Sequence, residues 1–428
     1  KLQKNYKFLR CESRAKLLEL CRETTENVAK LNYSILNYFY KFAQKIITVK
    51  KILYLIIIVN SLFLQSLFSQ ELSQNAVVSL ITQDEGDELY AYFGHTALRI
   101  KDDSLGIDLA FNYGTFDFST PNFYTKFAKG TLNYCLSVET YESLVFSSSH
   151  NKRTLREQVL NLTYEEKLKT YQLLVNYYNS EARYYRYDFF YDNCATKIRD
   201  IIQEATNNRI DFSKSNFKGH SYRQLIMPFL EKNYWIDFGI NFILGLEADK
   251  KVPPEQYMFL PVYIHDFLEG SDFAQNSQVV LDASPAKKQG IDFGYILPWL
   301  IVLVWGMLIY FKKTRGFFKY LLFTIFGLLG LFILCFGLYS EHTAVLYNLN
   351  TIWSLPALLI LIFSWSKKWL HYIKLGYLII LLLHLINWFW LPQQMSTTFL
   401  PWMCLLIFTL LVDLNYFKYF KKRKATKN

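Results

Sequence analysis

The strongest constraint on the fold of this chain is the uneven distribution of its long apolar runs. Each run near the C-terminus approaches the roughly 20 apolar residues that cross a bilayer. These candidate spanning helices are Tyr295–Phe311, Tyr320–Tyr339, Ile352–Trp365, Ile373–Trp390 and Leu400–Leu414. No comparable run lies between about Glu71 and Gly294. The sequence therefore predicts a water-exposed domain, residues 71–294, followed by five transmembrane helices in residues 295–414.

A further apolar run precedes the water-exposed domain. Residues 51–70 combine flanking lysines, an apolar stretch and small or polar residues, which is typical of a signal peptide or an N-terminal anchor. Either interpretation exports the domain that follows. Residues 1–50 lie ahead of this signal, and we interpret them as a leader of doubtful status.

The charge of the connections between the apolar runs predicts their orientation. The segments KKTRGFFK and SKKWLHYIK and the tail at residues 415–428 are basic, whereas SEHTAVLYNLN and LPQQMSTTF contain no Lys or Arg. The positive-inside rule places the C-terminus in the cytoplasm. Five spans that end inside must begin outside, which agrees with the signal. The net charge of +11 thus reflects membrane topology, and we expect no nucleic-acid partner.

The sequence of the exported domain predicts an α+β fold. Its first part predicts four strands: two between Ala76 and Ile100 around the turn DEGDE, then IDLAFNYG and GTLNYCLSV. Residues 163–183 predict a helix with a capping box formed by Thr163 and Glu166. A second helix begins near Cys194, and its apolar stripe is expected to pack against the domain. The stripe consists of Ala195, Ile198, Ile201, Ile202 and Ala205.

Cys194 is a candidate nucleophile because it lies at the start of this helix. The positive end of a helix dipole and its unpaired N–H groups lower the pKa of a thiol. His95, in AYFGHTALRI, is the candidate base, since a strand holds it rigidly. It approaches the thiol if the helix lies on its side of the sheet. A polar residue on the next strand is expected to orient the imidazole. We expect Asn112 in this role, with Asp108 and Asp117 as alternatives.

Simpler interpretations of these residues remain open. A Cys at a helix start is often a packed small residue, and a strand His is often only hydrogen-bonded. Of the six cysteines, Cys135 and Cys194 are exported and are able to form a disulfide in an oxidising compartment. That pairing would fit a non-catalytic sensor or assembly protein. No zinc-like Cys/His spacing is present, so no metal or cofactor is expected.

Together these motifs resemble the Lnb-type lipoprotein N-acyltransferases. The resemblance rests on FGHTALRI, FNYGTFDF, NFYTKFAKGTLNY, YDFFYDNCATKIRD and SEHTAVLYNLNTIWSLP, and on a layout in which an exported domain precedes five spans. It covers most of the chain from Ala76 to Leu414. It implies a permuted papain-like (NlpC/P60-like) fold, in which the His strand precedes the Cys helix.

The resemblance also implies a reaction. Cys194 would attack a lipid ester to give a thioester, and the N-terminal amine of a diacylglyceryl-cysteine lipoprotein would then accept the acyl group. The implied partners are a phospholipid acyl donor, bacterial lipoproteins and the inner (cytoplasmic) membrane, with the catalytic domain in the periplasm. The expected substrate-binding residues are Asn193, Tyr92, Arg186 and His342. Arg183, His384 and Asn387 are weaker site candidates.

A second function uses the same two residues. A membrane-tethered Cys peptidase or amidase would act on cell-wall peptide, and it differs from a transferase only in whether water or an amine reaches the thioester. Five spans favour a lipid substrate, because a wall hydrolase needs only one anchor.

Overall fold

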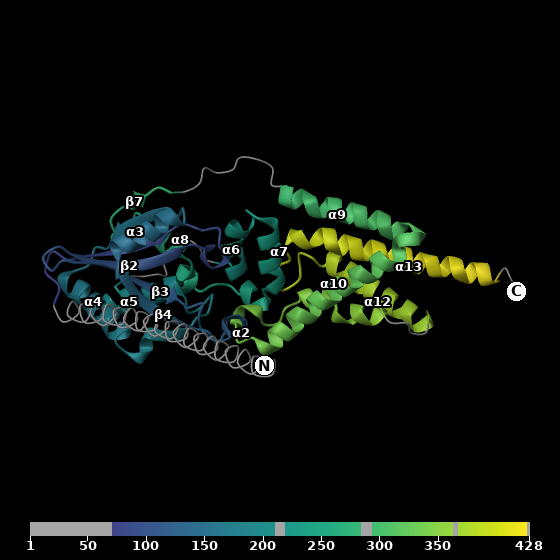
Figure 1. Ribbon diagram of the computed structural model, residues 1–428, viewed down its shortest axis with the longest axis horizontal. Helices are drawn as coiled ribbons and strands as arrows, with labels where there is room; N and C mark the ends of the chain where they lie inside the picture. The colour runs from purple at the N-terminus through teal and green to yellow at the C-terminus, as the bar shows by residue number, and fades with distance from the viewer. Residues whose placement is uncertain (1–70, 210–218, 284–292, 363–366, 426–428) are drawn as a thin grey trace, which may run out of the picture. The chain divides into compact units, whose positions relative to one another are not determined.

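The computed structural model describes residues 71–209, 219–283, 293–362 and 367–425 (Figure 1). The leader expected at residues 1–50 and the signal or anchor expected at 51–70 lie outside the described residues. The chain from Leu72 onward forms one compact unit.

An antiparallel sheet organises the N-terminal half. Within the described residues its strands follow the order β6-β4-β3-β2-β1-β5-β7. The strands are β1 (Val77–Gln83), β2 (His95–Asp102), β3 (Ile107–Thr115), β4 (Asn133–Thr140), β5 (Leu155–Val159), β6 (Tyr184–Arg186) and β7 (Gln278–Leu281). The predicted first four strands are confirmed as β1 to β4, with the short helix η1 (Leu89–Ala91) between the first two.

Consecutive residues of a strand point to opposite faces of its sheet. In the central strands both sets of residues are buried, so both faces of the sheet are covered. One face packs against α3 (Tyr141–His150) through Ile81, Ala97 and Ala110. The intervening residues, such as Leu80 and Leu98, are also fully buried. On their side lie α4 (Tyr164–Tyr178) and α5 (Cys194–Ala205), and α5 contacts β2 and β3 (Figure 1). The sheet is therefore sandwiched between helices.

The two predicted helices form as their sequences suggest. Thr163 caps α4, and the reciprocal bonds between Thr163 and Glu166 confirm the capping box. The apolar stripe of α5 is buried throughout its predicted length. The apolar positions at helical spacing thus fix α5 against the sheet, and with it the position of Cys194.

Smaller elements complete the exported half. They are α2 (Phe123–Lys129), η2 (Glu181–Arg183), α6 (Tyr222–Leu230), α7 (Tyr234–Ile243), η4 (Leu246–Asp249), η5 (Pro254–Phe259) and α8 (Pro261–Leu268).

Among the described residues, four helices are long and apolar enough to cross a membrane. They are α9 (Phe293–Tyr310), α10 (Lys312–Tyr339), α12 (Lys367–Ile386) and α13 (Leu400–Ala425). Short helices η6 (Thr343–Val345) and η8 (Thr397–Phe399) lie in the connections.

The stretch predicted as the third span is not one long helix. It consists of α11 (Asn350–Trp353) and η7 (Pro356–Ile362), and residues 363–366 are outside the described part. Pro356 lacks the N–H that would continue the helix across the break. The segment packs closely on α10, where a Cβ at Gly330 would lie 1.5 Å from the Ser354 oxygen. The count of five spans stays a prediction.

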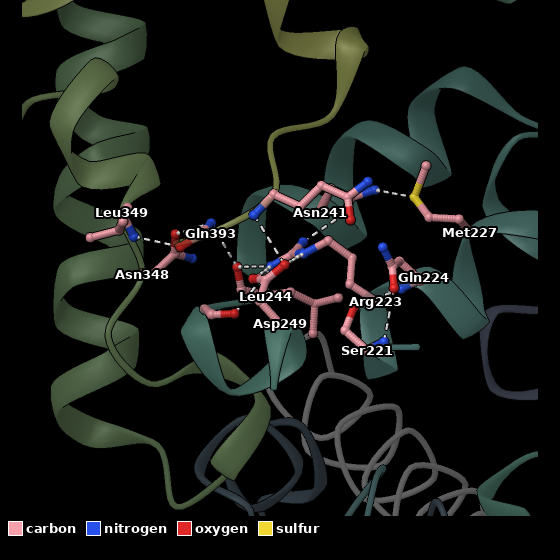
Figure 2. Close-up of polar contacts among 12 residues, drawn as sticks. Ser221, Arg223, Gln224, Met227, Asn241, Leu244, Asp249, Asn348, Leu349 and Gln393 are labelled. Atoms are coloured by element: carbon pink, nitrogen blue, oxygen red, sulfur yellow. Dashed lines mark hydrogen bonds and ion pairs between the residues drawn. The ribbon is translucent and has the colours of Figure 1, made fainter. Parts of the chain in front are cut away.

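A buried polar network joins the exported half to the connections between the membrane helices (Figure 2). At its centre is Arg223 of α6, whose Nε and Nη2 atoms donate to the two Asp249 carboxylate oxygens at 2.9 and 3.0 Å. Its Nη1 donates to Asn241 at 2.7 Å, and Nη2 also reaches the Leu244 and Gly245 oxygens. All three guanidinium nitrogens therefore have acceptors.

The same network continues into the membrane half. The Gln394 N–H donates to Asp249 at 3.0 Å, and Gln393 donates to the Leu244 oxygen at 3.2 Å. Asn348 donates to the Phe242 and Ile243 oxygens, both at 2.8 Å. Asn348 and Gln393, from the connections before α11 and α13, thus donate to main-chain oxygens at the C-terminal end of α7, which lack partners within the helix.

Candidate active site

Cys194 is the first residue of α5, and the preceding residue caps that helix. The Asn193 Oδ1 atom accepts hydrogen bonds from the N–H groups of Ala195 and Thr196 at 2.8 and 3.0 Å. Its Nδ2 donates to the Phe189 and Phe259 oxygens, both at 2.8 Å. Asn193 was expected to bind substrate. Its side-chain bonds within the protein hold the N-terminus of α5 in place, and its role in substrate binding stays a prediction.

Cys194 is a free, buried thiol that is 9% exposed. Burial raises its pKa, and the main-chain N–H groups of Thr96, Ala195 and Cys194 itself oppose that rise, as does the charge of Arg153. These N–H groups favour the thiolate because they donate to negative sulfur. Cys135 is also a free thiol. The disulfide considered between Cys135 and Cys194 is therefore absent.

His95, the first residue of β2, is hydrogen-bonded to the predicted third residue. Its Nε2 lies 3.2 Å from Asn112 Oδ1, and Asn112 Nδ2 donates to Glu139 Oε1 at 3.0 Å. The carboxylate can only accept, so the amide must present its oxygen to the imidazole. His95 therefore carries its proton on Nε2, which leaves Nδ1 as the basic nitrogen. The alternatives are engaged elsewhere: Asp108 pairs with Arg99 and Asp117 bonds Ser119.

An interruption of the sheet brings Cys194 to the end of β2. The pairing of β2 with β3 runs as far as Leu98 and Phe111, and β3 then bulges between Asn112 and Thr115. Gly114 lies in this bulge at φ 91°, a conformation that favours glycine. A Cβ at Gly114 would lie 3.7 Å from the Cys194 Cβ. The α5 N-terminus thus meets the N–H of Thr96, the residue after His95.

By strict alternation, His95 points to the α3 face and not to the α5 face. The condition set for the prediction, a helix on the same side as His95, is therefore not met by the regular part of the sheet. The N-terminus of α5 instead approaches the start of β2, where His95 lies. Among the described residues no hydrogen bond joins the His95 ring to the Cys194 sulfur, and their catalytic pairing stays a prediction.

The pKa of His95 is lowered to about 4. Burial is the largest cause, the positive charge of Arg153 adds to it, and the hydrogen bond with Asn112 opposes it. At neutral pH the imidazole is uncharged and able to accept a proton at Nδ1. The resting site thus holds a neutral imidazole beside a neutral thiol.

Arg153 is a site residue that the sequence did not reveal. It precedes β5, at the sheet end where Gln83 pairs with both His95 and Leu155. It is 9% exposed. Its one side-chain hydrogen bond within the described residues runs from Nε to the Asp84 oxygen at 2.9 Å, and Nη2 is buried without a partner. The register of β2, β1 and β5 brings Arg153 to this end of the sheet, and no local sequence motif indicates that register.

The remaining predicted substrate residues each have defined contacts within the protein. Tyr92 follows η1 and is half-buried, with its ring against Phe93. Arg186 forms an exposed ion pair with Glu341 at 2.6 Å. His342 Nε2 lies 2.8 Å from the Phe127 oxygen. Arg186 and His342 therefore connect β6 and α2 to the loop after α10, and their roles in substrate binding stay predictions.

The weaker candidates also have defined surroundings. Arg183 donates to the Leu136 oxygen at 2.9 Å and stacks on Tyr178. Asn387 donates to the Leu383 oxygen within its own helix. His384 is buried in α12, and its Nε2 has no partner among the described residues. In the same part of the chain, no cluster of three or more His, Cys, Asp or Glu side chains is placed to hold a metal ion.

Comparison with known families matches both halves of the chain. The Lnb N-terminal periplasmic domain matches residues 65–227, and the Lnb transmembrane domain matches residues 290–423. Neither a curated protein nor a solved structure gives a significant match. The two matches assign the sheet-containing half to the periplasm and the helical half to the membrane.

Proposed function

This chain belongs to the Lnb family, and we propose that it is a lipoprotein N-acyltransferase of the bacterial inner membrane. Its acyl donor is a phospholipid, and its acceptor is the N-terminal amine of a diacylglyceryl-cysteine lipoprotein. The catalytic domain lies in the periplasm and adopts a permuted papain-like arrangement, in which the His strand precedes the Cys helix. Five spans anchor it and leave the C-terminus in the cytoplasm.

The proposed chemistry uses two half-reactions at Cys194. His95 Nδ1 takes the thiol proton, and the sulfur attacks the ester carbonyl carbon of the donor. The ester C–O bond breaks, and the leaving alkoxide takes the proton from His95. The lipoprotein amine then attacks the thioester and gives a proton to His95, which returns it to the departing thiolate.

The observation that carries the proposal is the chain of contacts from Glu139 through Asn112 to His95. It assigns the imidazole proton to Nε2 and leaves the opposite nitrogen basic, in a residue that adjoins Thr96, whose main-chain N–H opposes the rise in the pKa of Cys194. Membrane tethering supports a lipid substrate, because it raises the effective concentration of membrane-bound donors and acceptors.

The test compares Cys194→Ala and His95→Ala with the wild type. We expect both variants to insert normally and to lose N-acylation, measured by mass spectrometry of lipoprotein N-terminal peptides. In the wild type, an acyl group that hydroxylamine releases should be found on Cys194. Unchanged N-acylation in a Cys194→Ala strain without a second acyltransferase would refute the proposal. Altered wall fragments in place of altered lipoproteins would identify the amidase alternative.

A further inference from the structure

Tyr185 places a buried hydroxyl group beside Cys194, and the mechanism above does not use it. The Oη atom has no hydrogen-bond partner within the described residues. Buried hydroxyl groups are normally paired, because an unpaired one loses its bonds to water without replacement. A Cβ at Gly114 would lie 3.9 Å from this oxygen and 3.7 Å from the Cys194 Cβ. The hydroxyl and the nucleophile thus flank the same glycine.

The ring of Tyr185 is held on several sides. It pairs with Tyr134 across β4 and β6 and contacts Tyr113 edge-on at 6.0 Å between ring centroids. The Lys197 ammonium lies 4.7 Å above it, and Asp192 holds that ammonium at 2.8 Å. These contacts fix the direction of the hydroxyl. Donors that are fixed in advance stabilise charge without reorganising during the reaction.

The hydroxyl also keeps its proton. Burial raises the pKa of Tyr185, and a negative charge on Cys194 raises it further. The group is therefore a hydrogen-bond donor at every pH at which the reaction is expected to run.

We propose that Tyr185 is a catalytic residue whose hydroxyl donates a hydrogen bond to the oxyanion formed when Cys194 attacks an acyl carbonyl. This inference rests on the proposed function. As the S–C bond forms, the π electrons of the carbonyl move to its oxygen. Tyr185 donates to that oxygen without transferring its proton, and the bond is released when the C–O bond of the donor breaks. The same oxyanion forms again during attack by the amine.

Two groups of hydrogen-bond donors near Cys194 have different roles in this proposal. The main-chain N–H groups of Thr96, Ala195 and Cys194 oppose the rise in the pKa of the Cys194 thiol, so they act on the thiolate. The Tyr185 hydroxyl has no acceptor in the part of the chain that the structure describes, so it is available to a substrate oxygen. Its contribution therefore belongs to the transition state, where it raises the rate and not the affinity for substrate.

The experiment compares Tyr185→Phe with wild type as full-length proteins in phospholipid vesicles, with a synthetic diacylglyceryl-cysteine peptide as acceptor. Loss of one oxyanion donor lowers the rate of acyl transfer by about 100-fold or more. Alkylation of Cys194 by iodoacetamide forms no oxyanion, so its rate should not change. The melting temperature should stay the same or rise, because the hydroxyl makes no hydrogen bond with any described residue.

Tyr234→Phe is the matched control. The Tyr234 hydroxyl donates to the Thr398 oxygen at 2.7 Å and accepts from Trp402 at 2.9 Å, so its removal should lower the melting temperature and leave transfer per folded molecule unchanged. Transfer by Tyr185→Phe within threefold of wild type would overturn the inference. So would an equal fall in alkylation, which would make Tyr185 a support for the thiol. Retained N-acylation in Cys194→Ala would instead refute the proposed function.

Discussion

Two buried arginines, Arg223 and Arg153, differ in how fully the protein satisfies their polar groups, and so do the regions in which they lie. Arg223, at the junction with the membrane helices, is 1% exposed and has an acceptor for each guanidinium nitrogen, including a carboxylate. Arg153, near Cys194, is 9% exposed, has one main-chain acceptor and pairs with no carboxylate among the described residues. A buried cation without a counter-ion destabilises the folded state, so the two residues cannot serve the same purpose.

The difference extends to the neighbouring hydroxyl groups. The Tyr234 hydroxyl at the junction both donates and accepts a hydrogen bond, whereas the Tyr185 oxygen near Cys194 has no partner among the residues that the structure describes. The junction satisfies its buried polar groups within the protein, which is what a rigid connection requires. The region around Cys194 keeps donors available. Unpaired buried donors gathered near a thiol are therefore better evidence of a site than the thiol alone.

The largest effect is expected from Arg223→Gln. The change leaves Asp249, 9% exposed as a side chain, buried without its cation. Breaking a buried pair in this way costs about 3–5 kcal/mol of folding free energy. We expect a large fall in the denaturant concentration at the midpoint of unfolding, measured by tryptophan fluorescence of the protein in detergent.

Lys250→Gln provides the control for that variant. Lys250 pairs with Glu247 at 2.7 Å, but its side chain is 64% exposed, so its loss should cost less than about 1 kcal/mol. If Arg223→Gln proves as stable as Lys250→Gln, the junction network is not a structural connection, and the contrast between the two arginines disappears.

Arg153→Gln is expected to act on reactivity and not on stability. The charge of Arg153 favours the Cys194 thiolate and lowers the pKa of His95. Without it, alkylation of Cys194 at fixed pH should slow by about three- to tenfold, since a shift of one pKa unit changes the thiolate fraction tenfold. The pKa of His95 should rise toward its ordinary value, so the acid limb of the acylation profile should move to higher pH.

Arg153→Lys tests whether charge is the cause. A lysine restores the cation but not the guanidinium geometry, so alkylation should recover toward wild type. The free energy of unfolding of Arg153→Gln should equal or exceed that of the wild type. A fall as large as that of Arg223→Gln would mean that Arg153 is also a structural residue and would remove the distinction.

The sequence was informative where a local pattern determines local structure. The capping residues Thr163 and Glu166 and the apolar stripe of α5 predicted helices that form as expected. The alternating strands placed His95 at the start of β2. These features depend on residues a few positions apart. Asn193 caps α5, as a polar residue directly before a helix commonly does, and its expected contact with substrate stays a prediction.

Residues that depend on register were not predictable. Glu139 reaches Asn112 because β4 pairs with β3, and Arg153 reaches the site through the pairing of β1 with both β2 and β5. A shift of one residue would turn each side chain to the opposite face, and a single sequence does not fix that shift. The bulge at Gly114 likewise belongs to the sheet as a whole. It determines how α5 meets β2.

The smallest effect is expected from Cys135→Ser, which sharpens the comparison between two thiols in one domain. Burial raises the pKa of both Cys135 and Cys194, and each lies near an arginine, Arg183 or Arg153. Cys135 is in mid-strand on β4, paired with Thr115 and Tyr184. Its main chain is committed to the sheet, so it has no equivalent of the N–H groups that α5 directs at the Cys194 sulfur.

We therefore expect Cys135→Ser to keep acyl transfer and Cys194 alkylation within about twofold of wild type, and to change stability by less than about 1 kcal/mol, as replacements away from special contacts usually do. Peptide mapping of the oxidised wild type should find no Cys135–Cys194 link. Loss of activity, or a linked peptide, would revive the sensor interpretation. The reason to expect neither is that burial raises the pKa of both thiols, and of the two only Cys194 also has the N–H groups at the N-terminus of a capped helix to oppose that rise.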